Sequence, residues 1–179
     1  MSAADPAHLC IETDRLLLRA LGPGDEALLQ GVFERCADHF RALTGAAGPE
    51  PDAALRELRA SAEAPGRTVV AITRLDGGEA VGVAGWWLGN PEPDRALLGM
   101  LMVAPEHRGA GIAREALEGV EVWLAGQGMR AIRTAFQRRR LAVHPVVRAL
   151  GFREMSIADH TLLGLAGAGI SLWEKPVGG

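Results

Sequence analysis

Apolar and polar residues follow one another in blocks, and the spacing inside each block predicts strands and helices in succession. Residues 15–20 form a short apolar run that ends at Gly22-Pro23-Gly24, which is typical of a strand followed by a turn. Apolar side chains then recur at helical spacing over residues 25–43, with Asp25 placed to cap that helix. A shorter helix is expected over residues 53–60. Residues 1–10 show no such pattern and are expected to form a loose leader.

The middle of the chain predicts a hairpin and then a buried strand. Residues 68–74 and 80–88 are rich in apolar residues and are joined by Asp76-Gly77-Gly78, a strong hairpin signal. Residues 96–103 are almost continuously apolar, as expected of a strand buried on both faces. A helix is expected from about residue 111 to 127, with an apolar stripe toward the core and Gly128 at its end.

The last third predicts three more strands and one helix. A strand is expected at residues 131–136 and a short helix at 141–150, with Pro145 in its first turn because proline lacks an amide hydrogen. Residues 152–157 and 170–175 predict two closing strands joined by a glycine-rich loop. No repeat or linker divides the sequence, so a single α+β domain over residues 1–179 is expected.

The charge and cysteine content argue against several functions. The 19 Lys and Arg residues against 22 Asp and Glu give a net charge of -3, whereas a nucleic-acid binder usually has a basic surplus. No apolar run approaches the ~20 residues that a membrane span requires, and the first residues do not resemble a signal peptide. The two cysteines have no metal-ligand spacing. These features predict a cytoplasmic protein without a metal, nucleic-acid or membrane partner.

The segment Arg108-Gly109-Ala110-Gly111-Ile112-Ala113 joins the apolar strand to the helix that follows it. The first amides of a helix lack intrahelical partners and the helix dipole adds positive potential, so such a terminus binds phosphate oxygens. The two glycines let a pyrophosphate approach the backbone, the small Ala113 keeps that approach open, and Arg108 adds a positive charge. A P-loop is excluded because the turn lacks lysine, and a dinucleotide fingerprint because its glycine spacing differs. An ordinary strand-to-helix turn is the alternative interpretation.

Together with its flanks, this turn resembles the GNAT superfamily of N-acetyltransferases, whose motif is Arg/Gln-x-x-Gly-x-Gly/Ala. Arg108, Gly111 and Ala113 fill the three defined positions. The start, Ile11-Glu12-Thr13-Asp14-Arg15-Leu16-Leu17-Leu18-Arg19, is similar to the first strand of the branch that includes ribosomal-protein N-acetyltransferases. The segment Val146 to Glu154, with its Gly151-Phe152, is similar to the family's last helix and the residues after it.

The resemblance implies a mixed, mostly antiparallel sheet of six to seven strands with about four helices. It implies an enzyme, an acetyl-CoA-dependent N-acetyltransferase, in which two central strands splay apart to admit the pantetheine arm of acetyl-CoA, the co-substrate. The acceptor is then a primary amine of a small molecule or a protein N-terminus, which attacks the thioester directly. A homodimer is compatible with the family. A non-catalytic acyl-CoA binding or sensing domain is the alternative. The resemblance assigns coenzyme contacts to Leu101, Met102, Val103, Arg108, Gly109, Ala110, Gly111, Ile112, Ala113 and Arg140.

The catalytic groups are less defined, because the chain contains no tyrosine. Many family members protonate the leaving thiolate with a tyrosine of the last helix, and Val147 occupies that position here. Arg140 stands where the family often has an asparagine. The amide near Met102 is a candidate oxyanion donor. His144, near the expected thiol, is a candidate acid or base, with a surface or helix-initiating role as the alternative.

Acceptor-binding candidates come from the first long helix and the paired tryptophans. His39 is also a weak candidate base, and Asp38 and His39 are candidates for the acceptor pocket, with a solvated helix end as the alternative. Trp86 is a third candidate, since one of the two tryptophans at 86 and 87 must face outward. Glu92 and Asp94, in the loop before the strand at 96–103, could attract a cationic amine, with an ordinary charged loop as the alternative, and His160 falls in the closing loop. Cys36 fits the apolar stripe and is expected in the core.

Overall fold

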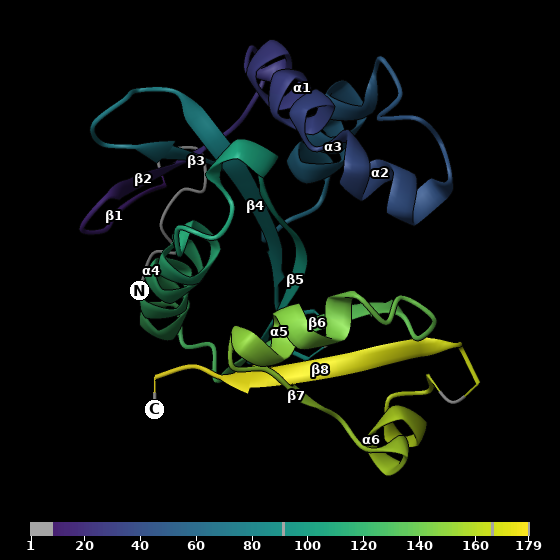
Figure 1. The fold of residues 1–179 in the computed structure, drawn as a ribbon. Coiled ribbons are helices and arrows are strands. Elements are labelled where there is room, and N and C mark those ends of the chain that lie inside the picture. Colours follow the sequence, from purple (N-terminus) through teal and green to yellow (C-terminus); the bar gives the residue numbers. More distant parts are fainter. Residues whose placement is uncertain (1–8, 91, 166, 179) are drawn as a thin grey trace.

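The computed structural model describes residues 9–90, 92–165 and 167–178, and its strands form one twisted sheet with helices on both faces (Figure 1). The strands are β1 (Cys10–Glu12), β2 (Leu16–Ala20), β3 (Arg67–Arg74), β4 (Ala80–Leu88), β5 (Arg95–Val103), β6 (Ala131–Gln137), β7 (Arg153–Glu154) and β8 (Ile170–Pro176). The helices are α1 (Glu26–Arg35), α2 (Ala37–Thr44), α3 (Ala53–Glu63), the short 3₁₀ helix η2 (Pro105–His107), α4 (Ile112–Gly126), α5 (Val143–Ala149) and α6 (Ile157–Leu162).

The order of strands across the sheet is β1-β2-β3-β4-β5-β6-β8-β7, and every neighbouring pair is antiparallel except β5 and β6. This confirms the α+β class and the mostly antiparallel sheet. Over the described residues the sheet has eight strands and the chain has six α helices, more than expected from sequence. The surplus comes from short elements, which carry too few residues to show a period.

Two apolar cores lie on opposite faces of the sheet. Helices α1, α2 and α3 gather on one side in Figure 1, and Leu29, Phe33 and Leu58 pack there against Val69 and Val83 of the sheet. Helix α4 covers the other face. Its predicted apolar stripe is confirmed: the buried side chains of α4 are Ile112, Ala116, Leu117, Val120 and Leu124. Successive side chains of β4 and β5 therefore alternate between the α1–α3 face and the α4 face of the sheet.

The single helix expected over residues 25–43 is wrong, because it is two helices that meet at Cys36. The bend allows Phe40 of α2 to contact Phe33 of α1, with ring centroids 5.1 Å apart. Asp25 does stand at the N-cap, but its carboxylate bonds the Gly22 amide and Arg19 instead of the helix amides. Cys36 is fully buried, as expected of a core residue.

Three further expectations need correction. The loose leader does not extend to residue 10, because Leu9 is buried and Cys10 begins β1; residues 1–8 lie outside the described residues. The strand at 95–103 is not buried on both faces, since Gly99 is exposed. The strand expected at 152–157 shortens to β7, because Ser156 caps helix α6 in a capping box with Asp159. In addition, no helix among the described residues is both long and apolar enough to cross a membrane.

Candidate active site

The glycine turn between η2 and α4 presents free amides to solvent. Gly109 and Gly111 have φ angles of 78° and 81°, a left-handed conformation that glycine adopts without a Cβ clash. Gly111 is the N-cap of α4, and the turn from Arg108 to Gly111 is exposed. Within the described residues, no backbone carbonyl accepts from the N–H groups of residues 109–113. The sequence prediction of an open, amide-rich helix terminus is thus matched by the geometry, which suits an anion such as a pyrophosphate.

A clasp formed by Thr13, Arg15 and Glu115 holds this turn. Arg15 donates from its backbone N and its Nε to the Glu115 carboxylate at 2.8 and 2.6 Å, and Thr13 Oγ1 donates to the same carboxylate at 2.6 Å. Burial alone would raise the pKa of Glu115, but these hydrogen bonds lower it. The Arg15 guanidinium also donates to the Ala110 carbonyl at 3.2 Å. Because C=O and N–H are antiparallel in a trans peptide, the Gly111 amide then points away from Arg15.

Arg15 is a site residue that sequence reasoning missed. It lies in the connection between β1 and β2, about one hundred residues before the turn, and no local pattern links the two. Its side chain is 56% exposed, and its guanidinium is engaged by Glu115 and the Ala110 carbonyl, so its role is to position the turn. The only available signal was its place within the segment that resembles the family's first strand.

Arg108 does not direct its charge at the turn. Its Nε donates to the Val103 carbonyl at 2.8 Å, and its two Nη atoms donate to the Asp38 carboxylate at 2.6 and 3.0 Å. This bidentate pair lowers the pKa of Asp38, chiefly through the hydrogen bonds. Arg108 and Asp38 therefore hold the end of β5 to helix α2, and Asp38 is not free to attract a cationic acceptor.

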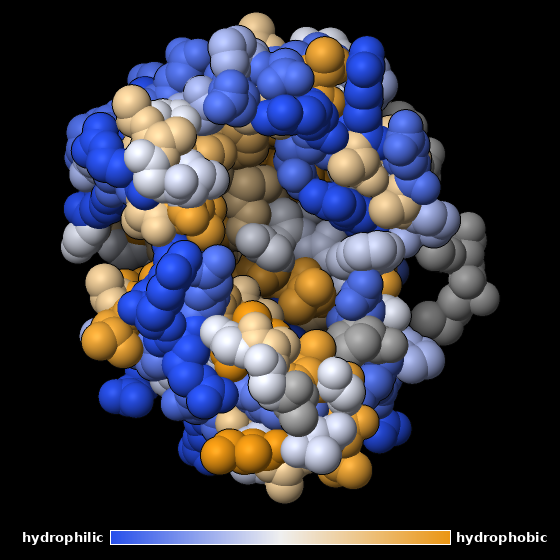
Figure 2. Space-filling model, turned by 90° about the vertical axis from the view of Figure 1, so that its right-hand side faces the viewer, coloured by the Kyte–Doolittle hydropathy of each residue, from blue (hydrophilic) through white to orange (hydrophobic). Residues whose placement is uncertain are grey.

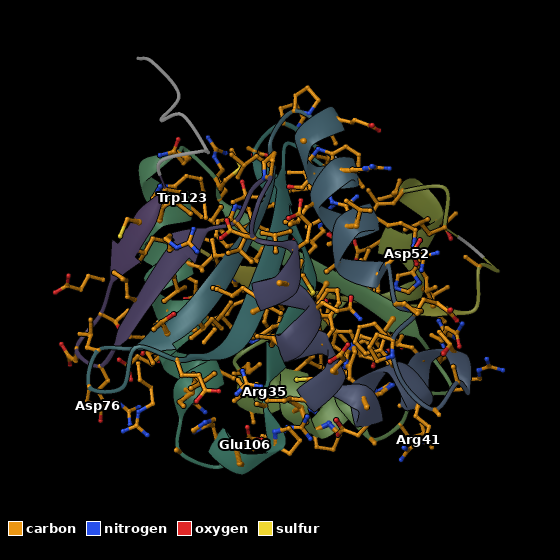
Figure 3. The ribbon with its side chains drawn as sticks, turned by 90° about the horizontal axis from the view of Figure 1, so that it is seen from above. Arg35, Arg41, Asp52, Asp76, Glu106 and Trp123 are labelled. Atoms are coloured by element: carbon orange, nitrogen blue, oxygen red, sulfur yellow. The ribbon has the colours of Figure 1, made fainter. Side chains whose placement is uncertain are left out.

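The segment before the turn is also held to α1. Arg35, the last residue of α1, pairs with Glu106 of η2 at 3.4 Å and with Glu79 at 2.7 Å, and the labelled Arg35 and Glu106 lie beside each other in Figure 3. The guanidinium also donates to the Ala80 carbonyl. Both ends of the connection between β5 and α4 are thus fixed to other parts of the fold.

Strands β5 and β6 separate after a short parallel contact. They pair only from Arg95–Ala131 to Leu97–Arg133, so the rest of β5 has no strand partner on that side among the described residues. A bulge contributes to this divergence: Trp86 pairs with Leu98 and Gly85 with Met100, which leaves Gly99 as the extra residue. The splay that the family resemblance implied is therefore present in the sheet.

The register decides which backbone groups line the gap. The Ala104 amide donates to Val81, so the alternation of antiparallel pairs makes Val83 and Met102 a hydrogen-bonded pair. The Met102 amide therefore faces β4, so the oxyanion donor expected near Met102 would have to be a neighbouring amide that faces the gap. Leu101 and Val103 direct their backbone groups away from β4, into the gap. The Val103 carbonyl there already accepts from Arg108, so the Leu101 groups and the Val103 amide are the ones that an extended ligand can pair with.

A pocket of about 560 Å³ opens on the α1–α3 side of the same strands. Figure 2 shows a central hollow with apolar atoms at its floor and hydrophilic residues around its rim. Gly99, Met100 and Met102 of β5 line the pocket, so it meets the gap along one strand. The remaining pocket residues are Phe33, His39, Phe40, Leu43, Ala53, Arg56, Glu57, Ala60, Arg67, Thr68, Gly85, Trp86, Trp87 and Leu97.

Of the acceptor candidates, His39 lies in this pocket, whereas Trp86 contributes little of its ring. Burial lowers the pKa of His39, and the nearby positive charges of Arg140 and Arg108 lower it further against the opposing effect of Asp38. His39 is therefore neutral near pH 7 and able to accept a proton. The Trp86 ring is buried on the other face against Trp123, with centroids 5.6 Å apart. The outward tryptophan is Trp87, whose Nε1 donates to the Pro65 carbonyl at 2.9 Å.

At the position of the missing tyrosine, helix α5 presents an apolar side chain. Val147 is buried, as the counting from Gly151 predicted. His144 packs edge-on against Phe136 and Trp173, at centroid distances of 5.2 and 5.5 Å, and its Nε2 is buried without a partner among the described residues. His144 thus belongs to an aromatic cluster, not to a hydrated helix surface. His160, expected in a loop, is buried in α6.

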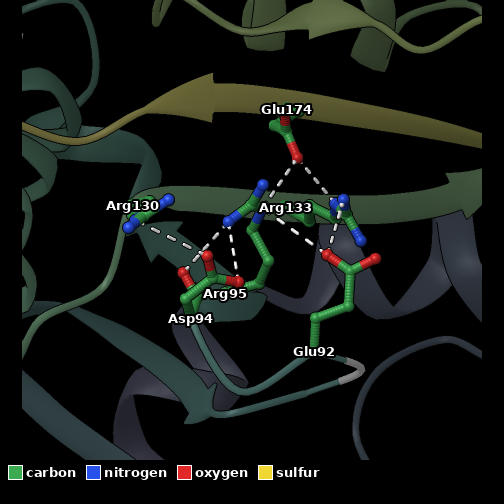
Figure 4. Close-up of polar contacts among 6 residues, drawn as sticks. All are labelled: Glu92, Asp94, Arg95, Arg130, Arg133 and Glu174. Carbon is green, nitrogen blue, oxygen red and sulfur yellow. Dashed lines mark hydrogen bonds and ion pairs between the residues drawn. The ribbon is translucent and has the colours of Figure 1, made fainter.

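Glu92 and Asp94 belong to an ion cluster at the base of the gap (Figure 4). Arg133 of β6, itself buried, pairs with Glu92 at 3.1 Å and with Glu174 at 2.7 Å. Asp94 pairs with Arg95 at 2.8 Å. Their carboxylates pair with these cations, which favours the alternative of a charged structural loop over the attraction of an acceptor amine. The cluster instead fixes the three paired residues from which β5 and β6 diverge.

The comparisons with known proteins agree with this geometry. The model of the Acetyltransferase (GNAT) family matches residues 33–152, while no curated protein matches the chain. The structure of an acetyltransferase from Thermus thermophilus is similar with a TM-score of 0.74 and 26% identity, covering 94% of this chain and 100% of that one.

Two less identical structures share the fold. A probable GNAT-family acetyltransferase from Chromobacterium violaceum has a TM-score of 0.75 and 17% identity, over 98% of this chain and 88% of that one. Spermidine N-acetyltransferase from Vibrio cholerae, in complex with CoA and spermine, has a TM-score of 0.66 and 15% identity, over 92% of this chain and 97% of that one.

Proposed function

The chain belongs to the acetyltransferase (GNAT) family and is an acetyl-CoA-dependent N-acetyltransferase, and from that premise we propose that it acetylates a primary amine held in the pocket beneath α1–α3. The observation that carries this proposal is that the gap between β5 and β6 and the pocket beneath α1–α3 both border β5. The gap reaches Leu101 and Val103 from one side, and the pocket reaches Met100 and Met102 from the other. An acetyl donor in the gap and an amine in the pocket would then be adjacent.

Acetyl-CoA supplies the thioester, and the proposed site has separate groups for its pyrophosphate and for its pantetheine arm. The pyrophosphate is assigned to the free amides of residues 109–113, which Arg15 holds in place through the Ala110 carbonyl. The pantetheine amides are assigned to the backbone groups of Leu101 and Val103. Arg140 stays a proposed coenzyme contact, and its positive charge also lowers the pKa of His39.

His39 is the proposed general base. The neutral amine forms a C–N bond with the thioester carbonyl, the C–S bond breaks, and the amine proton passes to His39 Nδ1 or Nε2. The thiolate takes a proton from water, since Val147 supplies none, and the protonated His39 returns its proton to the hydroxide that remains. A half-buried imidazole in the pocket, with its pKa lowered by burial, supports this role. The balanced reaction converts an amine and a thioester into an amide and a thiol.

We also propose that the chain belongs to the branch that includes ribosomal-protein N-acetyltransferases. The support is the segment from Ile11 to Arg19, whose Thr13 and Arg15 hold the glycine turn. This likeness concerns the coenzyme side of the site and leaves the acceptor undetermined.

Two measurements test the function. Titration calorimetry with acetyl-CoA measures binding, and thiol release across a panel of primary amines measures transfer. Binding with amine-dependent thiol release is expected. Binding without release for every amine would leave a non-catalytic acyl-CoA binding domain, and no binding at sub-millimolar acetyl-CoA would remove the coenzyme site altogether.

A further inference from the structure

The walls of the acceptor pocket are mainly apolar. Three elements of the α1–α3 layer supply aromatic and aliphatic side chains, and β4 and β5 supply Trp87, Leu97 and two methionines. Methionine side chains adapt to irregular apolar shapes. The volume of about 560 Å³ falls in the range of ~300–1,000 Å³ usual for small-molecule sites. The pocket therefore fits the body of one small molecule.

The polar groups of the pocket are mostly engaged by partners within the protein. Glu57, the one acidic residue among those lining it, accepts from Arg67 Nη2 at 2.7 Å. Arg56 pairs with Asp52 at 3.4 Å. The indole N–H of Trp87 already donates to Pro65. Among the described lining residues, no carboxylate is thus left without a cation, and few groups remain to bond a polar ligand.

From these walls, and resting on the function proposed above, we infer that the acceptor is a small primary monoamine with an apolar body. A second ammonium group in this pocket would lose its hydration and meet no free carboxylate. A peptide would bring backbone N–H and C=O groups, which would also lack partners there. An aromatic or aliphatic body loses nothing on entering and gains the burial of its apolar surface.

A matched pair of amines tests the inference. Hexylamine and 1,6-diaminohexane share one chain and differ by a single ammonium group. Because burying an unpaired charge costs more than ~1.4 kcal/mol, kcat/KM for hexylamine should exceed that for the diamine by about tenfold or more. A tetrapeptide with a free N-terminus and no lysine should be poorer than hexylamine as well.

A pair of variants locates the cause of the preference. Arg67→Gln removes the cation from Glu57, so the ratio of hexylamine to diamine kcat/KM should fall at least about threefold. The double variant Arg67→Gln with Glu57→Gln should restore the ratio, because no carboxylate remains. Thermal unfolding and acetyl-CoA affinity of each variant report on folding independently of this ratio.

The outcomes separate the two claims. Equal or better use of the diamine or the tetrapeptide by the unaltered protein overturns the inference and leaves the acetyl transfer in place. An unchanged ratio in Arg67→Gln, with normal acetyl-CoA affinity, also overturns it. Failure to release thiol with every acceptor, despite acetyl-CoA binding, removes the proposed function and this inference together.

Discussion

Replacing Gly111 with valine should weaken coenzyme binding without a corresponding loss of fold. Gly111 has a φ of 81°, and an L residue in the left-handed region costs about 1–2 kcal/mol. Space is not the obstacle, because an added Cβ would meet only Arg15 Nη2 at 3.5 Å, an ordinary contact. The backbone is expected to shift out of the left-handed region, and the free amides would then lose their orientation.

Gly128 provides a matched control at the other end of the same helix. Its φ is also 81°, and no atom lies within 4 Å of an added Cβ. Gly111→Val and Gly128→Val should therefore lose similar stability, which corresponds to a fall in Tm of about 2–8 °C for a chain of this size.

The two variants should differ in acetyl-CoA affinity, measured by titration calorimetry. Loss of one hydrogen bond to a charged phosphate costs ~1.5–3 kcal/mol, so Gly111→Val should bind about tenfold or more weakly. Gly128→Val should bind as the unaltered protein does. Equal affinity in both variants, at equal stability, would refute the assignment of the pyrophosphate to this turn.

Three other substitutions probe separate parts of the site. Arg15→Ala should raise the KM for acetyl-CoA by about tenfold. The control Arg19→Ala removes a similarly exposed ion pair on the adjoining strand and should change this KM less than about twofold. Equal effects of the two substitutions would remove Arg15 from the site. His39→Asn should abolish the acidic limb of the kcat/KM profile. Because the His39 pKa lies below the usual 6.5, kcat/KM of the unaltered protein should fall only as pH drops below that value. A pH profile unchanged in the variant would exclude His39 as the base. Asp38→Asn should flatten the acid end of the plot of unfolding free energy against pH. The lowered pKa of the Asp38 carboxylate contributes stability that is lost as pH falls below about 3.8. Urea unfolding between pH 3 and 6 measures this, and a pH dependence identical to that of the unaltered protein would contradict it.

Local patterns were sufficient for most of the fold. The hairpin at Asp76-Gly77-Gly78, the stripe of α4 and the glycine turn all depend on neighbouring residues, and their prediction from sequence was accurate. Helix α6 also had a local signal, the capping pair Ser156 and Asp159, which was overlooked because the apolar residues around it suited a strand.

The rest of the site depends on contacts that sequence order does not reveal. The pairing of Arg108 with Asp38 spans seventy residues and turns an expected phosphate ligand into a structural cation. The direction of the Met102 amide depends on the parity of the strand register, which one residue of slip would reverse. The lowered pKa of His39 likewise depends on distant parts of the chain, first through burial and then through the charge of Arg140 from beyond β6.

The clasp between Arg15 and Glu115 has a consequence for how the site is assembled. The family match covers residues 33–152, yet Thr13 and Arg15, which hold the glycine turn, precede it. A fragment cut to the matched residues would keep the turn and lose what orients it. During synthesis Arg15 leaves the ribosome one hundred residues before its partner carboxylate, so the coenzyme turn is completed only after a long loop has closed.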